Sequence, residues 1–173
     1  MKKIGFLADT HIRKNDGSDL PDAVLKAFKG VDLIVHLGDI GKKICIDRLA
    51  DVAPVMVQTD DRKGYQLAGS TDAGVYAIGD VGLTFNLAQP DKKIAVASDG
   101  ITFADDMGKL LLKRFKQDVK VVAFAATHDP MHLTYDGVQF VNPGSPTLPM
   151  TAPGTVAILD VSKKTAAAKI ISV

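Results

Sequence analysis

The sequence has no tryptophan, one cysteine and almost no net charge, and each shortage excludes a class of protein. Cys45 alone cannot form an internal disulfide, which fits a reducing compartment. A formal charge of +1 gives no electrostatic case for nucleic acid or acidic membranes as the main partner. No apolar run approaches the roughly 20 residues of a membrane span. The run after Lys3 is interrupted at Asp9, too early for a signal peptide, so we expect a first strand and a cytoplasmic protein.

The fingerprints of two common enzyme classes are also missing. No glycine-rich loop follows the first apolar run, where a dinucleotide-binding fold would carry one, and Asp9-Thr-His11 stands there instead. No Gly-x-Ser-x-Gly elbow of a serine hydrolase occurs. The remaining composition, 46% hydrophobic and 24% charged, is ordinary for a globular protein. We expect residues 1–173 to form a single domain, because this length suffices for one substantial core.

The first half alternates short apolar runs with amphipathic stretches, which is typical of parallel strands joined by helices. Pro21 suits the start of the first helix, and Gly30 ends it. Because parallel strands open at the same sheet edge, Asp9 and Asp39 should emerge close together. The pattern predicts strands at 4–8, 33–36 and 55–58 and helices at 21–28 and 44–52.

The second half changes character and favours a more antiparallel sheet. Turn residues separate its apolar runs, and Asp136-Gly137 is a strong hairpin-turn pair. One amphipathic helix is expected over 104–117, where four large apolar side chains share a face. The strands are expected at 75–78, 81–87, 93–97, 119–125, 131–135, 138–142, 156–159 and 168–171.

Four side chains at or just beyond predicted strand ends form a candidate metal site: Asp9, His11, Asp39 and His128. Mixed carboxylate and imidazole ligands suit Mn, Zn, Fe or Ni better than Mg or Ca. Such an ion would polarise a phosphoryl oxygen and make a hydroxide nucleophile from bound water. The alternative for this quartet is a fold retained after its chemistry was lost. His36, inside an apolar strand, is expected to be a core histidine, and His132 is expected to be exposed.

Five motifs follow one another along the chain: Asp9-Thr-His11, His36-Leu-Gly38-Asp39, a turn ending in Asp61-Arg62, Thr127-His128-Asp129-Pro130 and Asn142-Pro-Gly-Ser145. Their order resembles the calcineurin-like metallophosphoesterase superfamily, in particular its small bacterial and archaeal phosphodiesterases and the related retromer subunit of eukaryotes. The resemblance covers nearly the whole chain. It implies an α/β fold of two packed mixed β-sheets flanked by helices, a four-layer α/β/β/α sandwich with a two-metal site at the strand ends.

The departures from the family pattern fall on the second metal. Thr59 stands where the family carries a ligating asparagine, Asp99 where it carries a histidine, and Ala126 where it carries the first histidine of a Gly-His-Thr-His box. The resemblance leaves the four ligands of the first metal intact, and of the second set only Asp39 is unchanged. Asp99 is a candidate carboxylate ligand for a second ion, whose presence is doubtful.

The remaining site residues have two interpretations each. We assign catalysis to Asp39 and Asp60, although Asp60 could simply cap a turn. We assign substrate binding to Thr59 and Ser145, although Asn142-Pro-Gly-Ser145 mostly shapes a loop whose backbone could approach a phosphate.

Two functions stay open at this point. The first is a metal-dependent hydrolase of phosphodiesters or phosphomonoesters, with one divalent transition metal (Mn, Zn, Fe or Ni) and weak or specialised activity. The second is an inactive fold that serves as a protein-interaction module, with a protein partner or a second copy of the chain. The substrate of the first function is a phosphate ester of unknown identity.

Overall fold

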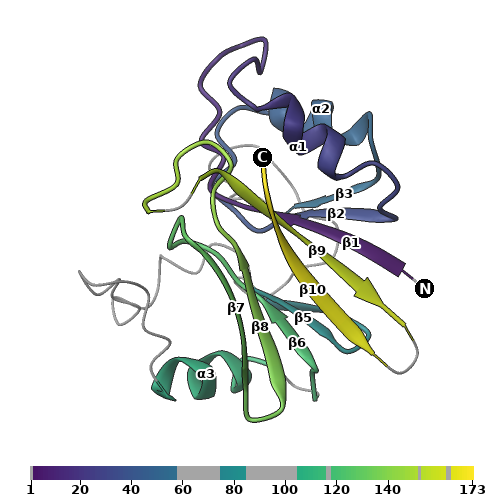
Figure 1. Cartoon of the computed structure of the whole chain (residues 1–173), viewed down its shortest axis with the longest axis vertical. Coiled ribbons are helices and arrows are strands. Elements are labelled where there is room, and N and C mark those ends of the chain that lie inside the picture. Colours follow the sequence, from purple (N-terminus) through teal and green to yellow (C-terminus); the bar gives the residue numbers. More distant parts are fainter. Residues whose placement is uncertain (1, 58–74, 85–104, 116–117, 152, 163–164) are drawn as a thin grey trace.

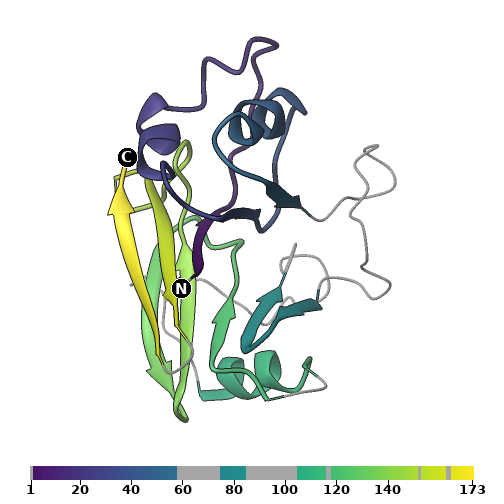
Figure 2. The same cartoon turned by 90° about the vertical axis from the view of Figure 1, so that its right-hand side faces the viewer.

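Two five-stranded sheets form the centre of the molecule in the computed structural model, which describes residues 2–57, 75–84, 105–115, 118–151, 153–162 and 165–173. The two views show two short helices above the first sheet and a third helix below the second (Figure 1, Figure 2). The layers therefore follow the order helix, sheet, sheet, helix. This arrangement confirms the predicted fold class.

The first sheet has the strand order β10-β9-β1-β2-β3. Its parallel half consists of β1 (Lys2–Leu7), β2 (Leu33–His36) and β3 (Val55–Val57), joined by α1 (Asp22–Ala27) and α2 (Ile44–Ala50). The antiparallel half consists of β9 (Thr155–Val161) and β10 (Ala166–Ser172). Leu7 of β1 lies beside His36 of β2, so the two strands end level with each other.

The second sheet has the order β4-β5-β6-β8-β7 and is mixed. Its strands are β4 (Val75–Ile78), β5 (Val81–Thr84), β6 (Val121–Ala123), β7 (Pro130–Tyr135) and β8 (Val138–Pro143). The pairs β5–β6 and β6–β8 are parallel, whereas β4–β5 and β7–β8 are antiparallel hairpins. The second half of the chain is more antiparallel, as expected, in β4–β5 and β7–β8, but the centre of this sheet is parallel, and α3 (Asp105–Leu112) lies in the chain between β5 and β6.

Three apolar clusters hold the layers together. Ile4 and Phe6 of β1 point into the cluster between the sheets, whereas Leu7 points into the cluster under α1 and α2. This alternation follows from the two-residue period of a strand. A Cβ on Gly5 would lie 2.7 Å from the Phe28 ring, so glycine lets that ring pack directly on the strand. The third cluster lies between α3 and the second sheet and includes Leu111, Val122, Phe124 and Phe140.

Most predicted elements are confirmed within a few residues. The helix expected over 104–117 is shorter, at Asp105–Leu112, and the strand expected over 81–87 is described as far as Thr84. The strand expected at 93–97 lies outside the described residues. In the described part of the chain no helix has both the length and the apolar character to cross a membrane. That residues 1–173 make one domain stays a prediction.

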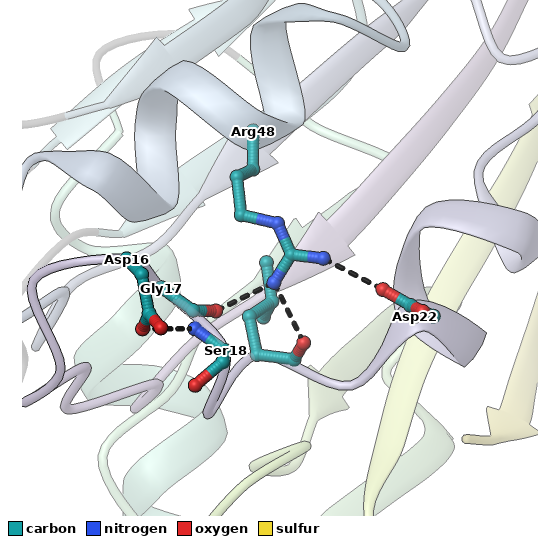
Figure 3. Close-up of polar contacts among 6 residues, drawn as sticks. Asp16, Gly17, Ser18, Asp22 and Arg48 are labelled. Carbon is teal, nitrogen blue, oxygen red and sulfur yellow. Dashed lines mark hydrogen bonds and ion pairs between the residues drawn. The ribbon is translucent and has the colours of Figure 1, made fainter.

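Arg48 of α2 fixes the loop that precedes α1 (Figure 3). Its guanidinium group donates hydrogen bonds to the carbonyl oxygens of Gly17 and, at 2.9 Å, Leu20. It also pairs with the Asp22 carboxylate at 2.7 Å. Within the loop, the Ser18 amide donates to the Asp16 carboxylate. The loop that follows His11 is therefore tied to the helix that follows Asp39.

Candidate metal centre

The pairing of β1 with β2 continues beyond both strand ends and brings the two predicted metal loops together. The amides of Asp9 and His11 each donate a 2.9 Å bond, to the carbonyls of Gly38 and Asp39 respectively. Ile12 then bonds to the Ile40 carbonyl at 3.0 Å. The parallel geometry that the sequence predicted thus places Asp9, His11 and Asp39 on adjoining loops.

Five residues of this region have a left-handed backbone although none of them is glycine. The φ angles are 52° at Asp9, 43° at His11, 50° at Asp39, 84° at Ala126 and 62° at His128. Such a conformation costs on the order of 1–3 kcal/mol for each residue and survives where the surrounding structure enforces it. Strain of this kind concentrates at functional sites, and here it falls on all four predicted ligands of the first metal.

Asp9, His11 and His128 form the one group of potential metal ligands found among the described residues. Each offers one ligand atom, and these atoms all lie within 4.8 Å of one another. The imidazole rings of His11 and His128 are stacked, with centroids 5.2 Å apart and 23° between the planes. One carboxylate and two imidazoles fit a divalent transition metal by the chemistry of their donors. Asp39 is not a member of this three-residue group, and it is exposed.

Hydrogen bonds from distant parts of the chain hold Asp9 in place. Its side chain is 1% exposed, and its carboxylate accepts a 3.1 Å bond from the amide of Ala126. Its backbone carbonyl accepts a 2.8 Å bond from the hydroxyl of Ser145. The site therefore combines β1 with the loops after β6 and β8, which belong to the other sheet.

The orientation of His128 is set by a backbone carbonyl. Its Nδ1 lies 2.8 Å from the oxygen of Leu148. Because a carbonyl oxygen only accepts, Nδ1 must carry the proton, which leaves Nε2 as the atom that can bind a metal. Metal-binding histidines usually donate their second nitrogen in this way.

Burial is the main reason why the pKa of Asp9 is raised from 3.8 to about 6. The nearby Asp39 carboxylate raises it further, whereas His128 and the amide of Ala126 lower it. Asp39 is therefore close enough to act on Asp9 through its charge. A cation bound beside Asp9 would stabilise its charged form and lower this pKa.

A buried network lies beneath the two loops. Nδ1 of His36 accepts a bond from the Gly38 amide at 3.3 Å, so Nε2 carries the proton and donates to the Thr10 hydroxyl at 2.8 Å. Thr10 in turn donates to the Ile40 carbonyl at 2.9 Å. Burial lowers the pKa of His36 to about 3, with a smaller contribution from His11. His36 is the core histidine that the sequence predicted, and it is neutral at physiological pH.

Other predicted site residues have mixed outcomes. Ser145 is fully buried, and its hydroxyl also accepts bonds from the amides of Thr147 and Leu148, so substrate contact through it stays a prediction. Thr59, Asp60 and Asp99 lie outside the described residues. The side chain of Ala126 is a methyl group and offers no ligand. His132 is exposed as expected and bonds to Gln139.

Sequence reasoning missed Thr10 and Leu148. Thr10 is the middle residue of the Asp-x-His motif, and the hydroxyl group of its side chain was the one feature of the sequence that could have indicated a buried hydrogen-bond network. Leu148 acts through its backbone carbonyl, which no residue identity reveals.

Comparisons with known proteins agree on one family. Residues 1–164 match the calcineurin-like phosphoesterase superfamily domain. A probable metallophosphoesterase of Methanocaldococcus jannaschii is 30% identical over 162 residues, which cover 93% of this chain and 77% of that protein. A probable metallophosphoesterase of Methanothermobacter thermautotrophicus is 28% identical over 171 residues, which cover 97% of this chain and 91% of that protein.

Solved structures show the same fold at lower identity. Vacuolar protein sorting 29 of Entamoeba histolytica, in a complex with zinc, has a TM-score of 0.64 at 15% identity, over 98% of both chains. An archaeal phosphodiesterase has a TM-score of 0.61 at 19% identity, over 98% of this chain and 99% of that one. With a family match over most of its length, the chain belongs to the calcineurin-like phosphoesterase superfamily.

Proposed function

We propose that the protein is a metal-dependent hydrolase of phosphodiesters or phosphomonoesters, with one complete metal site and weak or specialised activity. The observation that carries this proposal is the convergence of Asp9, His11 and His128 within 4.8 Å on a strained backbone. The donor set suits one divalent transition metal, Mn, Zn, Fe or Ni. We keep the cytoplasm as the expected location.

Each residue has a role in the proposed reaction. Asp9, His11 and His128 would hold the ion, with Asp39 completing the set from the adjoining loop. When bound, such an ion lowers the pKa of a water ligand and polarises a phosphoryl oxygen. Ser145 and Leu148 act before any substrate arrives, because they fix the Asp9 backbone and the His128 ring.

The second metal and the substrate contacts rest on the sequence alone. Asp60 remains the proposed further catalytic group, Asp99 the proposed ligand of a second ion, and Thr59 a proposed substrate contact. Ala126 offers no ligand at the same place, which supports a single metal.

The test is hydrolysis of bis(4-nitrophenyl) phosphate and 4-nitrophenyl phosphate over a panel of Mn, Zn, Ni and Fe. We expect turnover that depends on the metal and is abolished by Asp39→Asn and by His128→Asn. His132→Asn is the matched control, because His132 is an exposed histidine on β7. Turnover that persists in His128→Asn, or none with any metal, would contradict the proposal.

The alternative is a protein-interaction module, and the specific observation for it is the side chain of Ala126. With a methyl group beside Asp9, part of a two-metal centre is missing. On this alternative the folded protein turns nothing over, and Asp39→Asn changes neither its stability nor its oligomeric state by light scattering. Loss of efficient turnover in Asp39→Asn would rule it out.

A further inference from the structure

Two large apolar side chains are exposed on a loop that contacts the metal group. Leu148 is 41% exposed and Met150 is 66% exposed, and among the described residues these are the large hydrophobic side chains with the most contact to water. Both belong to the loop 144–151 that follows β8. The same loop supplies the carbonyl oxygen that lies 2.8 Å from His128 Nδ1, so the backbone of Leu148 contacts a proposed metal ligand.

Hydrogen bonds hold this loop in one shape. The hydroxyl of Thr147 donates to the Thr10 carbonyl at 2.7 Å, and the amide of Leu148 donates to the Ser145 hydroxyl at 2.9 Å. At its far end, the amide of Thr151 donates to the buried Asp129 carboxylate at 2.8 Å. Apolar side chains on a fixed loop form a preorganised surface, which loses little entropy when a ligand covers it.

The charge around the site is uneven. No charged residue occurs between Asp136 and Asp160, so the loop 144–151 is entirely neutral. In contrast, the cations Arg13 and Lys14 follow His11, and Lys42 and Lys43 follow Asp39. The loop itself therefore offers a substrate group apolar side chains and no charge of its own.

We propose that Leu148 and Met150 form an apolar subsite for the ester group that a phosphodiester substrate keeps after cleavage. This inference rests on the proposed function and specifies its substrate class as diesters with one apolar alkyl or aryl group. Water attacks phosphorus, the bond to the leaving alcohol breaks with protonation of that alcohol, and the apolar group stays on the monoester product.

The size of the surface favours a substrate over a protein partner. A stable protein interface buries about 800 Å² on each partner, which two side chains on one loop do not provide. A single ester group needs only a small apolar contact next to the polar groups that hold the phosphate.

The test compares two diesters with the same leaving group, bis(4-nitrophenyl) phosphate and methyl 4-nitrophenyl phosphate. We expect Leu148→Ser and Met150→Ser together to lower the ratio of the two kcat/KM values about tenfold, mainly through KM, because each lost apolar contact removes binding of the aryl group only. The control is Leu148→Ile with Met150→Leu, which keeps both exposed side chains apolar and should leave the ratio nearly unchanged. An unchanged ratio in the Leu148→Ser, Met150→Ser double variant would overturn the subsite.

A second measurement does not depend on turnover. The methyl resonance of Met150, assigned by its loss in Met150→Leu, is followed by NMR while phenylphosphonate or methylphosphonate is added. A larger shift with phenylphosphonate supports the subsite even if no diester is cleaved, in which case only the proposed function fails. Equal shifts with the two phosphonates would overturn the apolar subsite. Self-association of the protein that the Leu148→Ser, Met150→Ser double variant abolishes would also overturn it, because the surface would then bind a second copy of the chain.

Discussion

Replacement of Thr10 by valine tests whether the buried network beneath the metal loops stabilises the fold. Valine has nearly the shape of threonine but lacks the hydroxyl, which binds His36 Nε2 at 2.8 Å and the Ile40 carbonyl at 2.9 Å. All of this lies in a fully buried region, so water cannot replace the lost partner.

The magnitude follows from the two groups left behind. An unsatisfied buried polar group costs about 1–3 kcal/mol. The His36 Nε2–H loses its one partner, so its cost lies at the upper end of this range. The Ile40 carbonyl keeps a 3.0 Å bond from the Ile12 amide, so its cost lies at the lower end. We therefore expect Thr10→Val to lower the free energy of unfolding by roughly 2–4 kcal/mol, out of the 5–15 kcal/mol typical of a domain.

Urea unfolding of the metal-free protein measures this loss, with an unchanged m-value as the sign that only stability has changed. Thr10→Ser is the matched control, because it keeps the hydroxyl and removes one methyl group, at a cost of about 1 kcal/mol. Residues that orient metal ligands typically change metal affinity by about 10- to 100-fold, so zinc titration should separate the two variants as well. If Thr10→Val is no less stable than Thr10→Ser, the network does not carry the energy assigned to it.

Three further predictions follow from single residues. Because the pKa of Asp9 is raised to about 6, protonated Asp9 stabilises the metal-free protein below pH 3.8, and this stability is lost as the pH rises through 6, by about 3 kcal/mol in total. Urea unfolding in EDTA from pH 4 to 7.5 should show this fall in the free energy of unfolding. The Asp9→Asn variant should show a flatter dependence on pH. Burial raises the pKa of Cys45 to about 11, so a thiol reagent at pH 8 should react only after unfolding, and fast reaction of the folded protein would refute the burial. Gly41→Ala should destabilise the protein far more than Gly30→Ala, because a Cβ at Gly41 would clash with the backbone nitrogen of Ile12, while the equally left-handed Gly30 has open space. Equal losses of unfolding free energy in the two variants would contradict this close approach.

The sequence was informative where chemistry depends on residue type and strand order. Because parallel strands open at the same sheet edge, the sequence predicted that Asp9 and Asp39 emerge together, and the register of β1 with β2 agrees. It could not predict the contact between Ser145 and Asp9, which joins residues 136 apart in the chain through the packing of two sheets. The period of apolar residues along a strand shows which side chains face the core of its own sheet. It does not show which loops of the two sheets come into contact when the sheets pack.

The anchoring of Asp9 connects metal binding with the packing of the two sheets. Its amide is held by Gly38 from the first sheet, whereas its carboxylate and its carbonyl are held by Ala126 and Ser145 from the second. The left-handed conformation of Asp9 is therefore held by contacts from both sheets. A ligand that binds only this arrangement stabilises it by mass action, so metal affinity and sheet packing must be linked. A variant that loosens the contact between the sheets should therefore weaken metal binding, even when the substitution is far from His11 and His128. The loss in metal-binding free energy should equal the free energy by which the variant destabilises the assembled site.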